Sequence, residues 1–168
     1  MFLIKMFIFG LGWILTAVHA EDELIWAHAL GAQETDISYG LAVDAQGAIY
    51  TTGLFNRTVD FDPTAATMPL TSSGFSDLFI SKFNAQGELI WAQAIGNNQP
   101  SSGRDLALDT QGAVYVTGTF SGQVDFDSGP GVQLLTSAGT FDGFVLKLDA
   151  QGQFLWVQAF GGTGDEFS

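Results

Sequence analysis

Cysteine is absent from this sequence, and histidine and basic residues are scarce. The 168 residues include two His, and 5 Lys and Arg stand against 18 Asp and Glu, which gives a formal net charge of −13. Without cysteine the chain has no disulfide framework. Its acidity repels phosphate backbones and anionic lipid headgroups, so we expect neither nucleic acid nor a membrane surface as a partner. The acidic residues are interpreted as a solvated surface.

A helical period of apolar residues is also missing after residue 20. The chain there consists of β-branched and aromatic runs of strand length, such as Val114–Phe120 and Phe144–Leu148, bounded by turn residues. Runs of this kind predict strands rather than helices. The sequence therefore predicts an all-β fold.

The first 20 residues differ from the rest of the chain. A basic start, Met1–Lys5, precedes an apolar run of 13 residues, Met6–Val18, and small residues at Val18 and Ala20 stand at the usual cleavage offsets. A retained membrane helix would need about 20 apolar residues, so it fits less well. We predict a signal peptide over residues 1–20, cleaved after Ala20, and a secreted, periplasmic or cell-surface bacterial protein.

The remainder, residues 21–168, is dominated by a repeat of 65 residues. Leu24–Glu88 aligns without a gap on Leu89–Gln153, and about 30 of the 65 positions are identical. A truncated third copy covers residues 154–168. The same tryptophan lies near the start of each copy, at Trp26, Trp91 and Trp156. A fixed period predicts one supersecondary unit that recurs, with neighbouring copies burying each other's faces.

Each full copy contains two turns with Asp or Asn first and Gly fourth. The first residue can bond its own backbone and the glycine accepts a positive φ, which suits a type I turn with a G1 bulge in a hairpin. The turns are Asp44–Gly47, Asn84–Gly87, Asp109–Gly112 and Asp149–Gly152. They divide each period into four predicted strands: Leu41–Val43, Ile49–Phe55, Leu78–Phe83 and Leu89–Ile95, then Leu106–Leu108, Val114–Phe120, Gly143–Leu148 and Phe154–Phe160.

Both faces of these strands are largely apolar, one bulky and one small. In one strand Val114, Val116 and Phe120 share a face, and Tyr115 lies on the other. A sheet with one wet face would alternate more cleanly, so we predict four-stranded antiparallel blades stacked as in a β-propeller. An extra strand, Leu24–Leu30, would complete the last blade of a closed ring. An open β-solenoid or a sandwich is the alternative.

Three strings resemble the bacterial SBBP-type β-propeller repeat: Gly112–Gly118, Phe144–Asp149, and the tryptophan strand that ends in Gly161-Gly162. The resemblance covers nearly all of residues 24–162. It implies an exported, often large, multi-repeat bacterial protein of unassigned role. The first copy departs from the pattern in two loops, at Asn97-Asn98 and at Thr64–Pro69.

Two complete blades are fewer than the roughly four to eight of a propeller ring. We therefore predict that the chain is a propeller fragment. An open arc would expose a flat apolar face at each end, so we expect the isolated product to self-associate.

The candidate metal ligands are two pairs of aspartates. Alternation places both carboxylates of each pair on one side of a strand, and the pairs are Asp60 and Asp62, and Asp125 and Asp127. Two carboxylates beside a backbone-rich turn are weak calcium candidates. The alternative is that the aspartates bond the turn backbone. No other cofactor is expected.

No catalytic residue is predicted. His28 is the only histidine after residue 20 and aligns with Gln93 and Gln158, which favours a structural role over a catalytic one. The tryptophans are interpreted as blade packing rather than a ligand-stacking ladder. Asp77 and Asp142 are interpreted as turn residues.

We predict a non-enzymatic exported scaffold that presents loops for binding a protein, a glycan or a surface. The two copies differ mainly in the loops Ala32–Gly40 and Thr64–Pro69, as variable binding loops would. The alternative is part of an extracellular propeller enzyme, a hydrolase or lyase, whose active site lies in other blades or domains. That alternative rests on analogy of fold alone.

Overall fold

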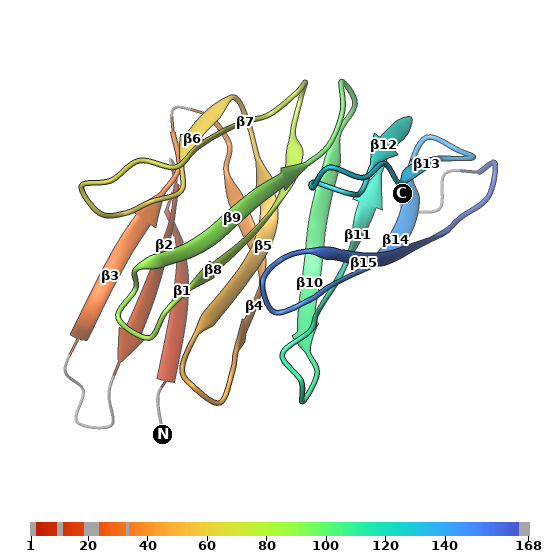
Figure 1. Cartoon of the computed structure of the whole chain (residues 1–168). Helices are drawn as coiled ribbons and strands as arrows, with labels where there is room; N and C mark the ends of the chain where they lie inside the picture. The colour runs from red at the N-terminus through yellow and green to blue at the C-terminus, as the bar shows by residue number, and fades with distance from the viewer. Residues whose placement is uncertain (1–2, 10–11, 19–23, 33, 165–168) are drawn as a thin grey trace.

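The computed structural model describes residues 3–9, 12–18, 24–32 and 34–164, and every regular element within these ranges is a β-strand. The fifteen strands form three larger antiparallel sheets, which stand one behind another across the molecule, and two small hairpins (Figure 1). This confirms the predicted all-β, propeller-like array. None of the sheets in the described residues closes into a ring.

Two of the sheets are four-stranded blades, as predicted. The first blade has the order β4 (Ile37–Val43), β5 (Ile49–Phe55), β8 (Asp77–Phe83) and β9 (Leu89–Ile95). The second blade repeats it with β10 (Ser101–Leu108), β11 (Val114–Phe120), β14 (Asp142–Leu148) and β15 (Phe154–Phe160). The first strand of each blade begins earlier than predicted. A register shift at Ser38/Gly40, and another at Gly103/Asp105, breaks the alternation there.

A short hairpin extends each blade between its second and third strands, and the sequence did not predict it. In the first blade β6 (Thr58–Asp60) pairs with β7 (Pro69–Thr71), and in the second β12 (Gln123–Asp125) pairs with β13 (Leu134–Thr136). Three-residue strands leave too short an alternation to recognise. Alternate apolar residues hold each hairpin to its blade: Val59 and Phe61 are buried, and the Phe61 ring lies 5.5 Å from that of Phe55.

The turns between paired strands have the predicted geometry. Gly47, Gly87, Gly112 and Gly152 have φ values of 82° or 83°. In the first turn, Asp44 Oδ1 accepts hydrogen bonds from the backbone N–H groups of Gln46 and Ala48, both at 2.9 Å. The other three turns repeat this pair of bonds from Asn84, Asp109 and Asp149.

The N-terminal sheet contains β1 (Leu3–Phe9), β2 (Gly12–Val18) and β3 (Leu24–Leu30), in that order. The predicted strand Leu24–Leu30 is therefore confirmed, although it pairs with β2 and not with the last blade. The backbone of the predicted signal peptide supplies β1 and β2. The Ala20–Glu21 junction lies outside the described residues, so its cleavage stays a prediction.

The core lies between the sheets, because each sheet covers a face of its neighbour. The face of the first blade that looks toward the N-terminal sheet, here called its near face, buries Ile49, Phe55, Phe79 and Phe83. Its opposite face buries Tyr50 and Ile80 against the second blade. The predicted covering of both faces is thus confirmed for the first blade.

The far face of the second blade, which points away from the first blade, is uncovered among the described residues. It is formed by Tyr115, Val145, Lys147, Trp156, Gln158 and Phe160, as the strand registers show. Trp156 is 42% exposed and Phe160 is 51% exposed. The equivalent face of the first blade is buried, since Tyr50 and Ile95 are 1% and 3% exposed.

Gly53 gives a direct test of this packing. A Cβ atom there would lie 1.9 Å from the carbonyl oxygen of Ile37 in the neighbouring strand. Because that oxygen belongs to the backbone, we expect Gly53→Ala to lower the free energy of unfolding by about 1–3 kcal/mol, measured by urea denaturation. Gly164→Ala is the matched control, since a Cβ at Gly164 meets nothing within 4 Å. Equal stability of the two variants would contradict this register.

Candidate binding surfaces at the blade seam and the hairpin rim

The blade seam is the contact between the last two strands of one sheet and the last turn of the next. Trp26 Nε1 in β3 donates to the carbonyl of Ala85, at 3.1 Å. One blade further, Gln93 Nε2 in β9 donates to the carbonyl of Gly152, at 3.3 Å. Lys82 Nζ donates to the carbonyl of Ala150, at 3.3 Å. Side chains of the N-terminal sheet and of the first blade thus donate hydrogen bonds to the turn carbonyls of the sheet that follows each of them.

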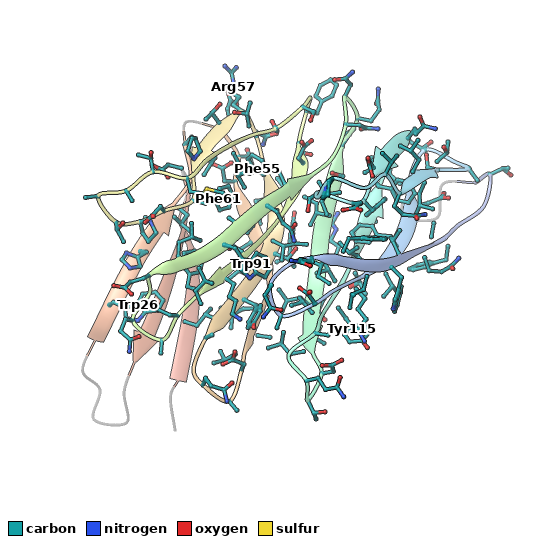
Figure 2. The ribbon with its side chains drawn as sticks, viewed as in Figure 1. Trp26, Phe55, Arg57, Phe61, Trp91 and Tyr115 are labelled. Carbon is teal, nitrogen blue, oxygen red and sulfur yellow. The ribbon has the colours of Figure 1, made fainter. Side chains whose placement is uncertain are left out.

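The tryptophans lie over the glycines of those turns. A Cβ at Gly152 would meet the Trp91 indole at 3.2 Å, and one at Gly87 would meet the Trp26 indole at 2.8 Å. Each position therefore needs glycine for two reasons: the turn requires a positive φ, and a side chain there would collide with the indole ring packed against the turn. Figure 2 shows Trp26 and Trp91 at successive places along the stack. These contacts agree with the interpretation of the tryptophans as blade packing.

His28 takes part in the same seam. Its ring stacks on Trp26 with centroids 5.1 Å apart, and its Nε2 lies against Gly87. A histidine held between an indole and a turn is positioned for packing. Its contacts agree with the structural role that the sequence indicates.

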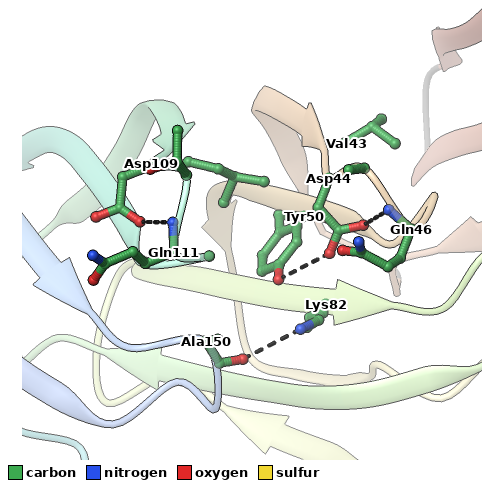
Figure 3. Close-up of a pocket in the computed structure, with 12 residues that line it drawn as sticks. Val43, Asp44, Gln46, Tyr50, Lys82, Asp109, Gln111 and Ala150 are labelled. Carbon is green, nitrogen blue, oxygen red and sulfur yellow. Dashed lines mark hydrogen bonds between the residues drawn. The ribbon is translucent and has the colours of Figure 1, made fainter.

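A pocket of about 470 Å³ opens between the first turn of the first blade, Asp44–Gly47, and the first turn of the second blade, Asp109–Gly112 (Figure 3). Its charged groups come from Asp44, Lys82 and Asp109, and the Tyr50 hydroxyl donates to Asp44 Oδ2 at 3.4 Å. Lys82 Nζ lies 4.8 Å from the centre of the Tyr50 ring. The pocket can accept a small polar group. Sequence reasoning missed it because its two walls are 65 residues apart, and the recurring Asp-x-Gln-Gly turn was the available signal.

The charges beside this pocket are fixed by hydrogen bonds. Backbone N–H donation, chiefly from Ala113, lowers the pKa of Asp109, and the Lys147 ammonium, 3.4 Å away, acts in the same direction. The hydrogen bond from Lys147 Nζ to the Tyr115 hydroxyl, at 2.6 Å, is the main cause that raises the pKa of Lys147. Both groups are therefore charged at neutral pH.

The four candidate metal ligands lie at the base of the hairpin loops. Asp60 Oδ1 accepts from the N–H groups of Asp62 and Met68, at 3.0 and 2.8 Å. Asp125 Oδ1 accepts in the same way from Asp127 and Gln133, at 3.1 and 2.8 Å. The second aspartate of each pair, Asp62 or Asp127, accepts from the N–H group two residues further on. Hydrogen bonds from Thr64 lower the pKa of Asp62.

These bonds are the turn contacts that the sequence offered as the alternative to calcium. No cluster of three or more His, Asp or Glu side chains that could hold a metal ion occurs in the part of the chain that the structure describes. Calcium binding by these aspartates stays a prediction.

Asp77 and Asp142 occupy equivalent buried positions at the start of β8 and β14. Asp77 Oδ2 accepts from the N–H and hydroxyl of Ser73, and burial raises the pKa of Asp77. Each carboxyl lies against a glycine: a Cβ at Gly96 would be 2.2 Å from Asp77, and one at Gly161 would be 2.5 Å from Asp142. The recurrence of these glycines is thereby explained by packing.

The hairpin rim, defined as residues 57–76 and 122–141, holds a second candidate surface. Both hairpins lie at the upper end of the view in Figure 1. Large apolar side chains are exposed along it: Met68, Phe75, Val132 and Leu134. Phe75 and Val132 are the most open, at 73% and 71%.

The segments that lead into the blades lie against this rim. In the first copy, Glu34 bonds Arg57 at 2.9 Å, and Asp36 Oδ1 accepts from Asn56 N at 3.1 Å. In the second, Asn97 Nδ2 donates to the carbonyls of Ser121 and Gln123. Loops that are distant in sequence are therefore gathered at one end of the stack.

Comparison with known proteins gives two relatives and no matching family model. The chain is 29% identical over 122 residues to the regulatory protein FlaEY of Caulobacter vibrioides, covering 73% of this chain and 13% of that protein. It is 26% identical over 129 residues to the uncharacterized WD repeat-containing protein L264 of Acanthamoeba polyphaga mimivirus, covering 73% of this chain and 9% of that protein. The chain thus spans about a tenth of the length of these relatives.

WD repeats are propeller blades, so the second relative agrees with the stacked four-stranded sheets. The resemblance to the SBBP-type repeat stays a prediction. No helix in the described ranges has the length and apolarity to cross a membrane.

Truncation of Trp91 tests the blade seam. We expect Trp91→Ala to lower the free energy of unfolding by about 2–4 kcal/mol, because the indole contacts Gly152 and the Tyr50 ring between two blades. Trp156→Ala is the matched control, since Trp156 occupies the same strand position on the uncovered far face. We expect it to cost less than about 1 kcal/mol. Equal losses of unfolding free energy in the two variants would show that the seam contacts of Trp91 do not stabilise the fold.

Removal of Asp125 separates its two interpretations. As a backbone acceptor it stabilises the hairpin in any buffer, so we expect Asp125→Ala to cost about 1–2 kcal/mol with calcium or with chelator. The melting temperature of the unsubstituted chain is measured with calcium and with chelator as the reference, because calcium that binds the folded state must raise it. A calcium-dependent rise that Asp125→Ala abolishes would instead establish the metal site.

Proposed function

We propose that the chain is part of an exported, non-enzymatic scaffold whose hairpin rim binds a protein partner. Stacked blades are a repeat architecture, and a WD repeat-containing protein is among its relatives. Repeat proteins of this kind use rigid blades to present loops. The rim is the surface that this proposal assigns to recognition.

The single observation that carries the proposal is where the two copies differ. None of residues 63–69, in the first hairpin loop, matches its equivalent in 128–134, and none of residues 32–40 matches its equivalent in 97–105. The seam groups, in contrast, recur unchanged, as Tyr50 and Lys82 do in Tyr115 and Lys147. Because residues 63–69 lie in the rim and Glu34, Asp36 and Asn97 contact it or the residues beside it, that surface differs between the copies while the stack is kept.

Exposed apolar side chains support a protein over a glycan as the partner. Large apolar groups exposed at neighbouring places on a surface are typical of protein interaction sites. Phe75 and Val132 are the anchors that we expect to be buried on binding. Export is supported by the composition of residues 1–20.

The test compares two variants as baits in cross-linking capture from the exported proteins of the source cell. The rim variant carries Phe75→Ser and Val132→Ser, and the control carries Gln86→Ser and Gln151→Ser in exposed turns of the other end. We expect one protein to be captured by the unsubstituted chain and by the control, and at least tenfold less by the rim variant. Recovery that is equal for all three baits would overturn the assignment of the rim.

The export part of the proposal has its own readout. We expect the protein recovered outside the inner membrane to begin at Glu21, as determined by N-terminal sequencing. Material that begins at Met1 in every fraction would contradict it.

A further inference from the structure

The N-terminal sheet is built in the register of the blades. Strands β2, β8 and β14 begin at Gly12, Asp77 and Asp142, at intervals of 65 residues. Their pairings with the strand that follows are equivalent: Trp13↔Leu30, Leu78↔Ile95 and Gly143↔Phe160. Even the register shifts recur, at Ala17/Val18, Lys82/Phe83 and Lys147/Leu148.

Strand β1 continues the equivalence. It pairs Leu3↔Val18 and Phe9↔Gly12, as β5 pairs Ile49↔Phe83 and Phe55↔Asp77. Residues 3–18 therefore stand in the second and third strand positions of a blade, and β3 stands in the fourth. The segment that the sequence marks for removal thus completes a sheet on the near face of the first blade.

Removal of residues 1–20 would leave β3 as a fourth strand with no third strand beside it. The near face of the first blade would keep only the cover that β3 provides, through Leu30 and Trp26. The far face of the second blade carries Tyr115, Lys147 and Trp156. These are the same residues, at the same positions, as Tyr50, Lys82 and Trp91, by which the first blade holds the second.

We propose that the processed chain assembles head to tail with a second copy of itself, in which β3 of one copy takes the place of β15 on β14 of the other. The proposal rests on the export and processing proposed above. The far face of one second blade would then cover the near face of the next first blade. This contact between copies would repeat the interface that already joins the two blades of one chain.

The equivalence of β3 and β15 makes this exchange possible. Both are seven-residue fourth strands with a tryptophan at the third position, Trp26 and Trp156. Paired on β14, β3 would place His28 opposite Val145, where Gln158 now lies. Exchange of one edge strand for its equivalent keeps the number of backbone hydrogen bonds to β14 unchanged. The free energy that favours assembly comes from the apolar surface that is buried between the copies. A head-to-tail contact of this kind produces open arrays or closed rings.

The experiment uses the full chain with a site-specific protease sequence inserted after Ala20, so that the protein folds before residues 1–20 are released. Two versions are mixed, one with Val145→Cys and one with His28→Cys. The chain has no cysteine of its own, so every disulfide joins introduced cysteines, and each version incubated alone is the control for disulfides between like chains. Val145→Cys with Gln158→Cys in one chain is the positive control, since these residues are opposite each other in the native register.

We expect a disulfide-linked dimer only after protease cleavage, with at least tenfold more product than before it. Ala29→Cys in place of His28→Cys is the register control and should give little product, because Ala29 points to the opposite face of β3. Val157→Ser in the Val145→Cys partner should increase the yield, because Val157 packs β15 against the core.

A cleaved mixture that stays monomeric by sedimentation, or one that cross-links equally through Ala29→Cys, would overturn the exchange. Because the protease replaces natural processing, either result would leave the export proposal standing. Conversely, if residues 1–20 are never removed in the cell, the export proposal fails, but the result of the cross-linking with the inserted protease sequence is unchanged.

Discussion

The burial of one sheet face by the next is the constraint on which the rest of the structure depends. Both faces of a blade are apolar, so a single blade in water would expose large side chains such as Tyr50, Ile80 and Phe79. Covering each of them is worth about 1.5–3 kcal/mol. Stacking is therefore a condition for folding, and Trp26, Trp91 and Lys82 contact the turns of the neighbouring sheet across the blade seam.

The sequence predicted the elements whose pattern is local. Strands such as β5, β8 and β11 follow from alternating apolar residues between turns of the form Asp/Asn-x-Gln-Gly, and turn chemistry fixes both the glycine φ and the register of the hairpin. The early parts of β4 and β10 were missed because bulges at Gly40 and Gly103 interrupt the alternation. The hairpins β6–β7 and β12–β13 were missed because three residues carry no period.

The candidate sites were less predictable, since they depend on contacts between copies. The pairing of Asp60 and Asp62 was visible in the sequence, but their bonds to Met68 and Thr64 depend on how the hairpin loop folds back. The pocket beside Lys82 and Asp109 needs two turns from different blades. That residues 3–18 stand in blade register could not be seen in their composition, because a run of apolar residues satisfies the requirements of both a leader and two strands.

The seam also bears on how such chains can change in length. Each sheet touches its neighbours through the same few groups, Trp91 over Gly152 and Trp26 over Gly87 among them. Insertion or loss of one whole 65-residue unit therefore re-forms every junction without a compensating substitution. Gene duplication and unequal recombination can lengthen or shorten such a protein in a single event, while point mutation alters the loops of each unit separately.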